Sequence, residues 1–217
     1  IALSEDVAKR YEAYGWHVQH VDWTHGGDHT DAKNYHEDVP ALWDALNAAE
    51  KSNYVWHGAS CLPPEYKRCL LALSRGGSDA DETREFDLGG KAFVKDGFFR
   101  PEAKGQLSWR DKDSVYVGTD FGPGSMTSSG YARIVKVWQR GTPMSAAKTI
   151  FEAGEKDLGA WGYHDFAPGF ERDFVQRAFA FYKNEWFVIG KDGKQVRIDV
   201  PNSADKGVHR EWLTVQL

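Results

Sequence analysis

The sequence has 217 residues, of which 41% are hydrophobic and 14% aromatic, which is enough apolar material for one large or two small domains. Its net charge is −5 and it has no basic block with interleaved aromatic residues, which argues against a nucleic-acid-binding protein. No apolar run approaches the roughly 18 to 20 residues of a membrane-spanning helix, and the N-terminal residues have no apolar signal core. We therefore expect no nucleic-acid or membrane partner and a cytoplasmic location.

The first part of the chain predicts a helix, a strand and a second helix. Ser4 is expected to be the N-cap of a helix, because apolar residues follow it at the spacing of one helix face, and the helix is expected to end at Gly15. WHVQHVDW at 16–23 alternates apolar and polar residues, as a half-buried strand does. HEDVPALWDALNAAEK at 36–51 has acidic residues at its start and one apolar face, which is typical of an amphipathic helix. We expect residues 1–53 to form a short helix–strand–helix segment.

Histidines gather in this first part of the chain. Among them, His25 and His29 lie with Asp28 in the polar loop THGGDHTDAKNY. Imidazole and carboxylate groups are ligands for zinc and nickel, but the spacing matches no named metal motif. We interpret these residues as polar loop side chains, and keep His25, Asp28 and His29 as the candidate metal ligands.

From about residue 54 the sequence changes to short alternating segments separated by Gly, Asp, Asn and Pro clusters. LGG at 88–90 and KDG at 191–193 each lie between two such segments, which predicts hairpins. Strand–turn units that recur without helices indicate a sandwich, a barrel or a propeller, and periodicity leaves these three open. The predicted strands are RCLLALSR, TREFDL, KAFVKD, QLSWR, SVYVGTD, ARIVKVWQR, TIFEA, DFVQRAFAFYKN, EWFVIGK, QVRIDV and EWLTVQL.

The two cysteines, Cys61 and Cys69, lie close together in CLPPEYKRC. A disulfide between them is an alternative, but two cysteines do not make the framework of four or more that disulfide-stabilised domains show. We therefore expect both thiols to be reduced.

The stretch TDFGPGSMTSSGY at 119–131 could be a phosphate-binding loop, a nucleophile loop or a turn. A P-loop needs G-x-x-x-x-G-K-[ST] leading into a helix, whereas this stretch leads into an alternating strand. A nucleophile elbow needs a glycine two residues after its serine, and Ser125 in GPGSM has none. We interpret the stretch as a structural loop with no direct chemical role for its hydroxyl residues, which are Ser125, Thr127, Ser128 and Ser129.

In the β part, we expect structural and not catalytic roles for two histidines and for the charged residues at 171–173. We expect His164 in GYHDF and His209 in VHREW to be hydrogen-bonded edge or loop residues. Glu171 and Arg172, with Asp173, are interpreted as a solvated charged loop.

Longer stretches resemble two known families. LSEDVAKRYEAYGWHVQHVDW and YHEDVPALWDALNAAEK, within residues 1–53, resemble a segment of transketolases. LSRGGSDADETREFD and VGTDFGPGSMTSSGY, within residues 54–217, resemble the β-propeller of bacterial prolyl oligopeptidases, which are serine peptidases of family S9. The two resemblances together predict a chimeric chain.

The propeller resemblance implies a mainly β fold, with a partial β-propeller of about three to four blades after the helix–strand–helix segment. It also implies a parent peptidase that cleaves short peptides after proline, with the propeller gating their access. The parent triad lies in a hydrolase domain with a G-x-S-x-G elbow, which this sequence lacks. We therefore expect no catalytic residue here, and whether the chain is an enzyme by itself stays open.

The expected partners are the missing hydrolase domain, a peptide substrate, or a second copy of the chain bound through open propeller edges. One alternative function is a binding or assembly module that uses those edges. Another is a transketolase-like fragment of sugar-phosphate metabolism. The Gly-Asp-Gly motif of that family is absent from this sequence, so we expect no thiamine diphosphate and no other cofactor.

Overall fold

The computed structural model describes residues 54–216, and all of them belong to one unit of the chain. The predicted helix–strand–helix segment lies outside the described residues. So do the candidate metal ligands His25, Asp28 and His29.

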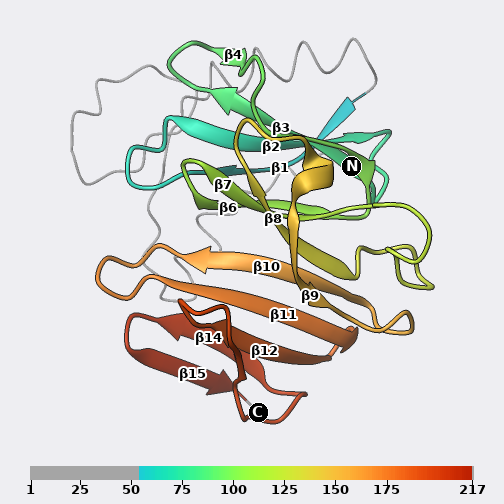
Figure 1. Ribbon diagram of the computed structural model, residues 1–217, viewed down its shortest axis with the longest axis vertical. Helices are drawn as coiled ribbons and strands as arrows, with labels where there is room; N and C mark the ends of the chain where they lie inside the picture. Colours follow the sequence, from blue (N-terminus) through green and yellow to red (C-terminus); the bar gives the residue numbers. More distant parts are fainter. Residues whose placement is uncertain (1–53, 217) are drawn as a thin grey trace, which may run out of the picture. The chain divides into compact units, whose positions relative to one another are not determined.

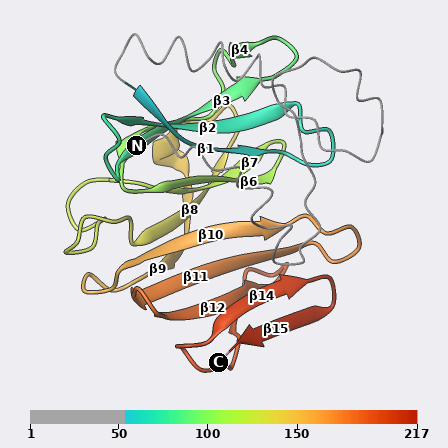
Figure 2. The same cartoon turned by 180° about the vertical axis from the view of Figure 1, so that it is seen from behind.

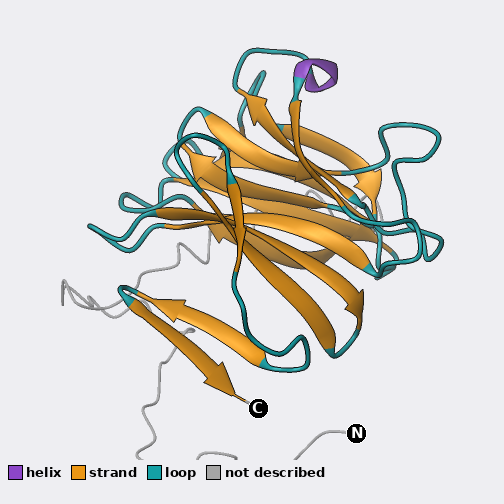
Figure 3. Ribbon diagram, turned by 60° about the horizontal axis from the view of Figure 1, so that its bottom comes forward, coloured by secondary structure: helices purple, strands orange, loops and turns teal. Residues whose placement is uncertain are grey.

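The described residues form four antiparallel sheets. The first contains β1 (Tyr54–Cys61), β2 (Arg68–Arg75), β3 (Asp81–Asp87), β4 (Ala92–Phe93) and β5 (Phe99–Ala103); the second contains β6 (Gln106–Asp111), β7 (Ser114–Gly118), β8 (Ile134–Gln139) and β9 (Lys148–Glu152). The third contains β10 (Gly159–Asp165), β11 (Arg172–Ala180), β12 (Lys183–Ile189) and β13 (Gln195–Arg197); the fourth contains β14 (Asp205–His209) and β15 (Trp212–Gln216). A single 3-10 turn, η1 (Met144–Ala146), precedes β9. The prediction of a mainly β fold is confirmed (Figure 3).

The sheets follow one another in chain order (Figures 1 and 2). Within each sheet, strands that follow one another in the sequence pair with each other, and β5 returns to pair with β3. None of the described helices could cross a membrane, since η1 has three residues.

Strand β7 explains how the second sheet packs on both of its neighbours. Its sequence SVYVG is buried throughout. Because successive side chains of a strand point to opposite faces, Val115 and Val117 join a core cluster with Leu70 of the first sheet. Tyr116 points the other way and packs with Val175 of the third sheet. A strand that is buried on both faces reads as a continuous apolar run.

Close packing requires glycine at two positions, one between sheets and one within the second sheet. A Cβ atom on Gly162 of β10 would lie 2.8 Å from the Tyr116 ring and 2.9 Å from Val135 Cγ1. A Cβ atom on Gly105 would lie 2.2 Å from the Gly118 carbonyl oxygen. Both distances are below van der Waals contact, so a side chain at Gly162 would push the second and third sheets apart, and one at Gly105 would push the start of β6 away from β7.

The two predicted hairpins are confirmed. LGG at 88–90 lies in the turn from β3 to β4, and KDG at 191–193 lies in the turn from β12 to β13. In the second turn the Gly193 N–H donates to the Gly190 carbonyl, and Gly193 has a φ of 78°, the left-handed conformation that glycine adopts without steric cost.

The prediction of two reduced cysteines is wrong. Cys61 and Cys69 form a disulfide, with their Cα atoms 3.9 Å apart. The two residues are direct partners across the β1–β2 hairpin, because the loop at 62–67 folds back with the Leu62 N–H bonded to the Arg68 carbonyl. The sequence separation alone did not reveal this register.

Candidate functional site

The loop at 119–133 joins β7 to β8, and its serine is used for structure. The Phe121 N–H donates to Ser125 Oγ at 2.8 Å, and Ser125 Oγ lies 2.6 Å from the Gly122 carbonyl oxygen and 3.1 Å from Asp120 Oδ1. Ser125 is buried. These contacts fit the structural interpretation of this serine, since they occupy the hydroxyl as donor and as acceptor.

The other hydroxyl residues of the loop are held locally as well. Thr127 Oγ1 lies 3.0 Å from Ser129 Oγ and accepts from the Tyr131 N–H. The Ser128 N–H donates to the Glu155 carbonyl at 2.7 Å, which ties this loop to the loop between β9 and β10. Within the described residues, no hydrogen bond joins these hydroxyls to a histidine, so no nucleophile–base pair forms here.

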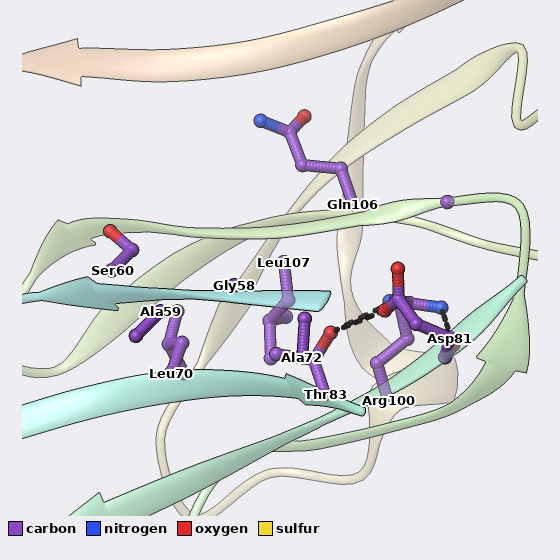
Figure 4. A pocket seen from close by; sticks show the side chains of 11 residues that line it. Gly58, Ala59, Ser60, Leu70, Ala72, Asp81, Thr83, Arg100, Gln106 and Leu107 are labelled. Atoms are coloured by element: carbon purple, nitrogen blue, oxygen red, sulfur yellow. Dashed lines mark hydrogen bonds and ion pairs between the residues drawn. The ribbon is translucent and has the colours of Figure 1, made fainter. Parts of the chain in front are cut away.

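A pocket of about 200 Å³ lies between the first and second sheets. Its lining includes residues 58–60 of β1, Gly105, and the first two residues of β6, Gln106 and Leu107. Figure 4 shows Arg100, Asp81 and Thr83 close together at one end of it. Sequence reasoning identified none of these three residues, because they come from β3 and β5 and match no motif.

A hydrogen-bond network centred on Arg100 occupies that end of the pocket. The Arg100 guanidinium is buried and donates to the carboxylate of Asp81, to Thr83 Oγ1 at 2.9 Å and to the Asp81, Pro101 and Ala103 carbonyls at 2.9 to 3.1 Å. Burial lowers the pKa of Arg100, and the Asp81 charge opposes that shift. His57 Nδ1 lies 2.9 Å from the second oxygen of Asp81. Since each charge is already paired, the network shapes the pocket and offers no free nucleophile.

A second polar cluster joins the second sheet to the third. Asp173 of β11 accepts from Arg110 Nε at 3.1 Å and from Arg110 Nη2 at 3.0 Å, and His164 Nδ1 lies 2.7 Å from its other oxygen. Burial alone would raise the pKa of Asp173, but His164, Tyr116 and Arg110 together hold it below its ordinary value. Burial and then the Asp173 charge raise the pKa of Tyr116 well above its usual range.

This cluster corrects one sequence interpretation and supports another. Arg172 and Asp173 belong to strand β11 and are half-buried, so they are not part of a solvated charged loop. Local sequence patterns could not reveal the pairing of Asp173 with Arg110, because the two residues are 63 positions apart in the sequence. His164 is hydrogen-bonded on β10, as expected, and His209 ends β14.

A third cluster joins the first sheet to the second. Glu85 of β3 is buried, and its carboxylate accepts from Arg140 Nη1 at 2.8 Å, from Arg140 Nη2 at 3.1 Å and from the Phe98 N–H at 3.0 Å. Arg68 Nη1 lies 3.4 Å from Glu85 Oε1. Each junction between the three larger sheets therefore has a carboxylate–arginine clamp.

The chain matches the family model described as "Prolyl oligopeptidase, N-terminal beta-propeller domain" over residues 21–164. It is 46% identical over 166 residues to an uncharacterized peptidase of Sinorhizobium fredii, covering 74% of this chain and 23% of that protein. It is 30% identical over 200 residues to an uncharacterized peptidase of Rickettsia prowazekii, covering 83% of this chain and 28% of that protein. The chain thus spans about a quarter of the length of these curated relatives.

Solved structures show the same fold. A post-proline cleaving enzyme from Rickettsia typhi superposes with a TM-score of 0.70 at 25% identity, covering 78% of this chain and 27% of that one. Oligopeptidase B from Leishmania major superposes with a TM-score of 0.61 at 12% identity, covering 82% of this chain and 25% of that one.

The family match begins at residue 21, inside the segment that resembled transketolases. None of these matches supports the transketolase resemblance or a chimeric chain. The sequence match, the antiparallel sheets and the solved structures agree that the chain belongs to the prolyl oligopeptidase family and contains sequence of its N-terminal β-propeller domain.

Proposed function

We propose that this chain is the gating propeller portion of a serine peptidase that hydrolyses short peptides after proline. The family match over residues 21–164 carries the proposal, and the likeness to the post-proline cleaving enzyme supports the proline preference. In this proposal each of the three larger sheets is one blade. The described residues then supply three blades and the first hairpin of a fourth, consistent with the three to four blades expected.

The gating part of the proposal uses the loops at one end of the sheets. The β7–β8 and β9–β10 loops meet through the bond from Ser128 to Glu155, and both lie at the right in Figure 1. Arg133 fixes the first loop further by donating to the Gly124 and Ala153 carbonyls at 2.6 and 2.9 Å. A rim built from fixed loops suits selection of substrates by size, because its opening does not widen to admit longer chains.

A region swap tests this function. The region of the Sinorhizobium relative that matches this chain is replaced by the corresponding residues of this chain, and hydrolysis is measured on a short proline-containing chromogenic peptide, its alanine counterpart and a long unfolded polypeptide. We expect cleavage of the proline peptide and rejection of both other substrates. A folded swapped enzyme that prefers alanine, or that degrades the long polypeptide as fast as the short peptide, would contradict the proposal.

A matched variant isolates the contribution of the sheets to gating. Glu85→Ala in the swapped enzyme loosens the clamp between the first two sheets without touching the loops. We expect it to raise cleavage of the long polypeptide while cleavage of the short proline peptide stays unchanged. An equal change in the cleavage rates of both substrates would mean that the clamp between these sheets does not control selection of substrates by size.

The exposed apolar residues of the last hairpin favour a second candidate, a binding or assembly module. Trp212, Leu213 and Val215 of β15 are 65%, 40% and 41% exposed, and within the described strands β14 and β15 pair only with each other. Apolar residues gathered on an open sheet are typical of interaction sites. Light scattering across a dilution series should show a mass that falls on dilution, and Trp212→Ser should give a monomer. A constant monomeric mass for the unaltered chain would refute self-association.

A further inference from the structure

Strand β1 is held in the described protein chiefly by its pairing with β2, which runs from Tyr54 opposite Arg75 to Cys61 opposite Cys69. It lies at the end of its sheet, and among the described strands it pairs only with β2. Five of its residues are exposed. Three hydrogen bonds connect it to β3 and β6, namely Tyr54 Oη to Glu82 Oε2 at 2.8 Å, His57 Nδ1 with Asp81 Oδ2 at 2.9 Å, and Trp109 Nε1 to the Ser60 carbonyl at 2.9 Å. An edge strand with one neighbouring strand and several exposed residues is the kind of element that opens locally.

Besides the loop at 62–67, a disulfide attaches this strand covalently to β2. It joins the last residue of β1, Cys61, to the second residue of β2, Cys69. Cys69 is fully buried against Leu71 and Phe86, whereas Cys61 is only partly buried. A thiol reductant therefore reaches the sulfur of Cys61 more readily than that of Cys69.

We propose that the Cys61–Cys69 disulfide is a redox-sensitive tether, and that its reduction by a small dithiol frees β1 and opens the adjoining pocket. The thiolate of the dithiol attacks Cys61 Sγ, forming a mixed disulfide and releasing the Cys69 thiolate, which takes up a proton. The second thiol of the reductant then displaces Cys61, which is protonated in turn. Two electrons and two protons pass to the protein, and the reductant becomes an intramolecular disulfide.

The pocket connects this chemistry to a change in the surface of the protein. Residues 58–60 of β1 form part of its lining, and Figure 4 shows Ala59 and Ser60 near Leu70 of β2. When β1 separates from β2, that part of the lining is lost and the Asp81–Arg100 pair becomes accessible to solvent. The disulfide closes a loop with a sequence separation of eight residues. This cross-link lowers the conformational entropy of the open chain, which reduces the equilibrium constant for opening by roughly 70-fold. Reduction should therefore raise the open population of β1 by up to that factor.

Hydrogen exchange measured by mass spectrometry on the full chain tests the proposal. The chain is compared as prepared, after treatment with dithiothreitol, and after reoxidation with glutathione disulfide, and alkylation followed by mass measurement confirms two free thiols in the reduced sample. We expect the amides of residues 54–61 to exchange faster by up to roughly 70-fold after reduction, and to slow again after reoxidation. Residues 183–197, which form the β12–β13 hairpin, serve as the internal control and should not change.

The variant Cys61→Ala/Cys69→Ala separates the tether from other effects of the reductant. Its β1 amides should exchange at the rate of the reduced protein whether or not dithiothreitol is present. Unchanged β1 exchange in a sample with two confirmed thiols would overturn the proposal. Faster exchange across all four sheets would overturn it too, since the disulfide would then stabilise the whole fold and not β1. The measurement needs no peptidase activity, so its outcome is independent of the proposed function.

Discussion

Replacing Glu85 by alanine removes the clamp between the first and second sheets. The buried carboxylate accepts two hydrogen bonds from Arg140 and one from the Phe98 N–H, and Arg68 lies at 3.4 Å. The alanine variant leaves Arg140 without a carboxylate partner there and leaves the buried Phe98 N–H without its acceptor. The expected result is a large loss of stability from a single exchange.

The structure allows the size of this loss to be estimated. Breaking a buried ion pair by removing one partner costs about 3–5 kcal/mol. The side chains of Arg140 and Arg68 are 31% and 42% exposed, so water solvates the freed guanidinium groups and lowers the cost. The unsatisfied Phe98 N–H adds about 1–3 kcal/mol. We expect Glu85→Ala to lower the free energy of unfolding by about 3 kcal/mol.

Urea unfolding followed by circular dichroism measures this free energy. The matched control is Glu102→Ala, because Glu102 pairs with Arg75 at 3.2 Å on the surface, with both side chains more than 40% exposed, and should lose no more than about 1 kcal/mol. The double variant Glu85→Ala/Arg140→Met should lose less than the sum of its two single variants, since both remove the same interaction. A loss for Glu85→Ala as small as that of the control, or full additivity, would refute the clamp.

Three further predictions concern the packing, the pH dependence and the loop. Gly162→Ala should lower the free energy of unfolding in urea by about 1–3 kcal/mol through overpacking against Tyr116, and Tyr116→Leu in the same chain should recover part of it; a neutral Gly162→Ala would contradict the close approach. Because the pKa of folded Asp173 lies below its unfolded value, its contribution to stability is present above about pH 4 and is lost as the pH falls. The melting temperature of Asp173→Asn should therefore vary less than that of the unaltered chain between about pH 4 and pH 2, and parallel curves would count against the cluster. Ser125→Ala should cost about 1–2 kcal/mol in urea unfolding yet leave kcat/KM of the swapped enzyme for the proline peptide unchanged; loss of turnover in a folded variant would assign this serine a chemical role.

Sequence pattern located most strands because alternation and turn chemistry act over a few residues. RCLLALSR coincides with β2, and LGG and KDG mark two of the turns. Four strands escaped notice, namely β1, β5, β10 and β14. In β10, GAWGYHD, glycine lowers the propensity for a strand, yet Gly162 is needed there because the Tyr116 ring lies directly against it. The steric requirement for glycine at position 162 therefore comes from a residue of another sheet.

The polar residues of the candidate site were beyond local reasoning for the same reason. Asp81 and Arg100 are 19 residues apart, and Glu85 and Arg140 are 55 apart. Each looks like an ordinary surface charge in sequence. Only the pairing of strands and the packing of sheets bury them together, where an unpaired charge would be costly.

The sequence by itself determined that the chain is mainly β, that it resembles the prolyl oligopeptidase propeller, and that its serine-rich loop lacks the motifs of a phosphate or nucleophile site. Each of these depends on residue types at short, fixed spacings. The tertiary structure alone decided that Cys61 and Cys69 are bonded, that Asp173 clamps two sheets, and that a pocket lies beside β1. These features depend on strand register and sheet packing, which bring together residues that no local spacing relates.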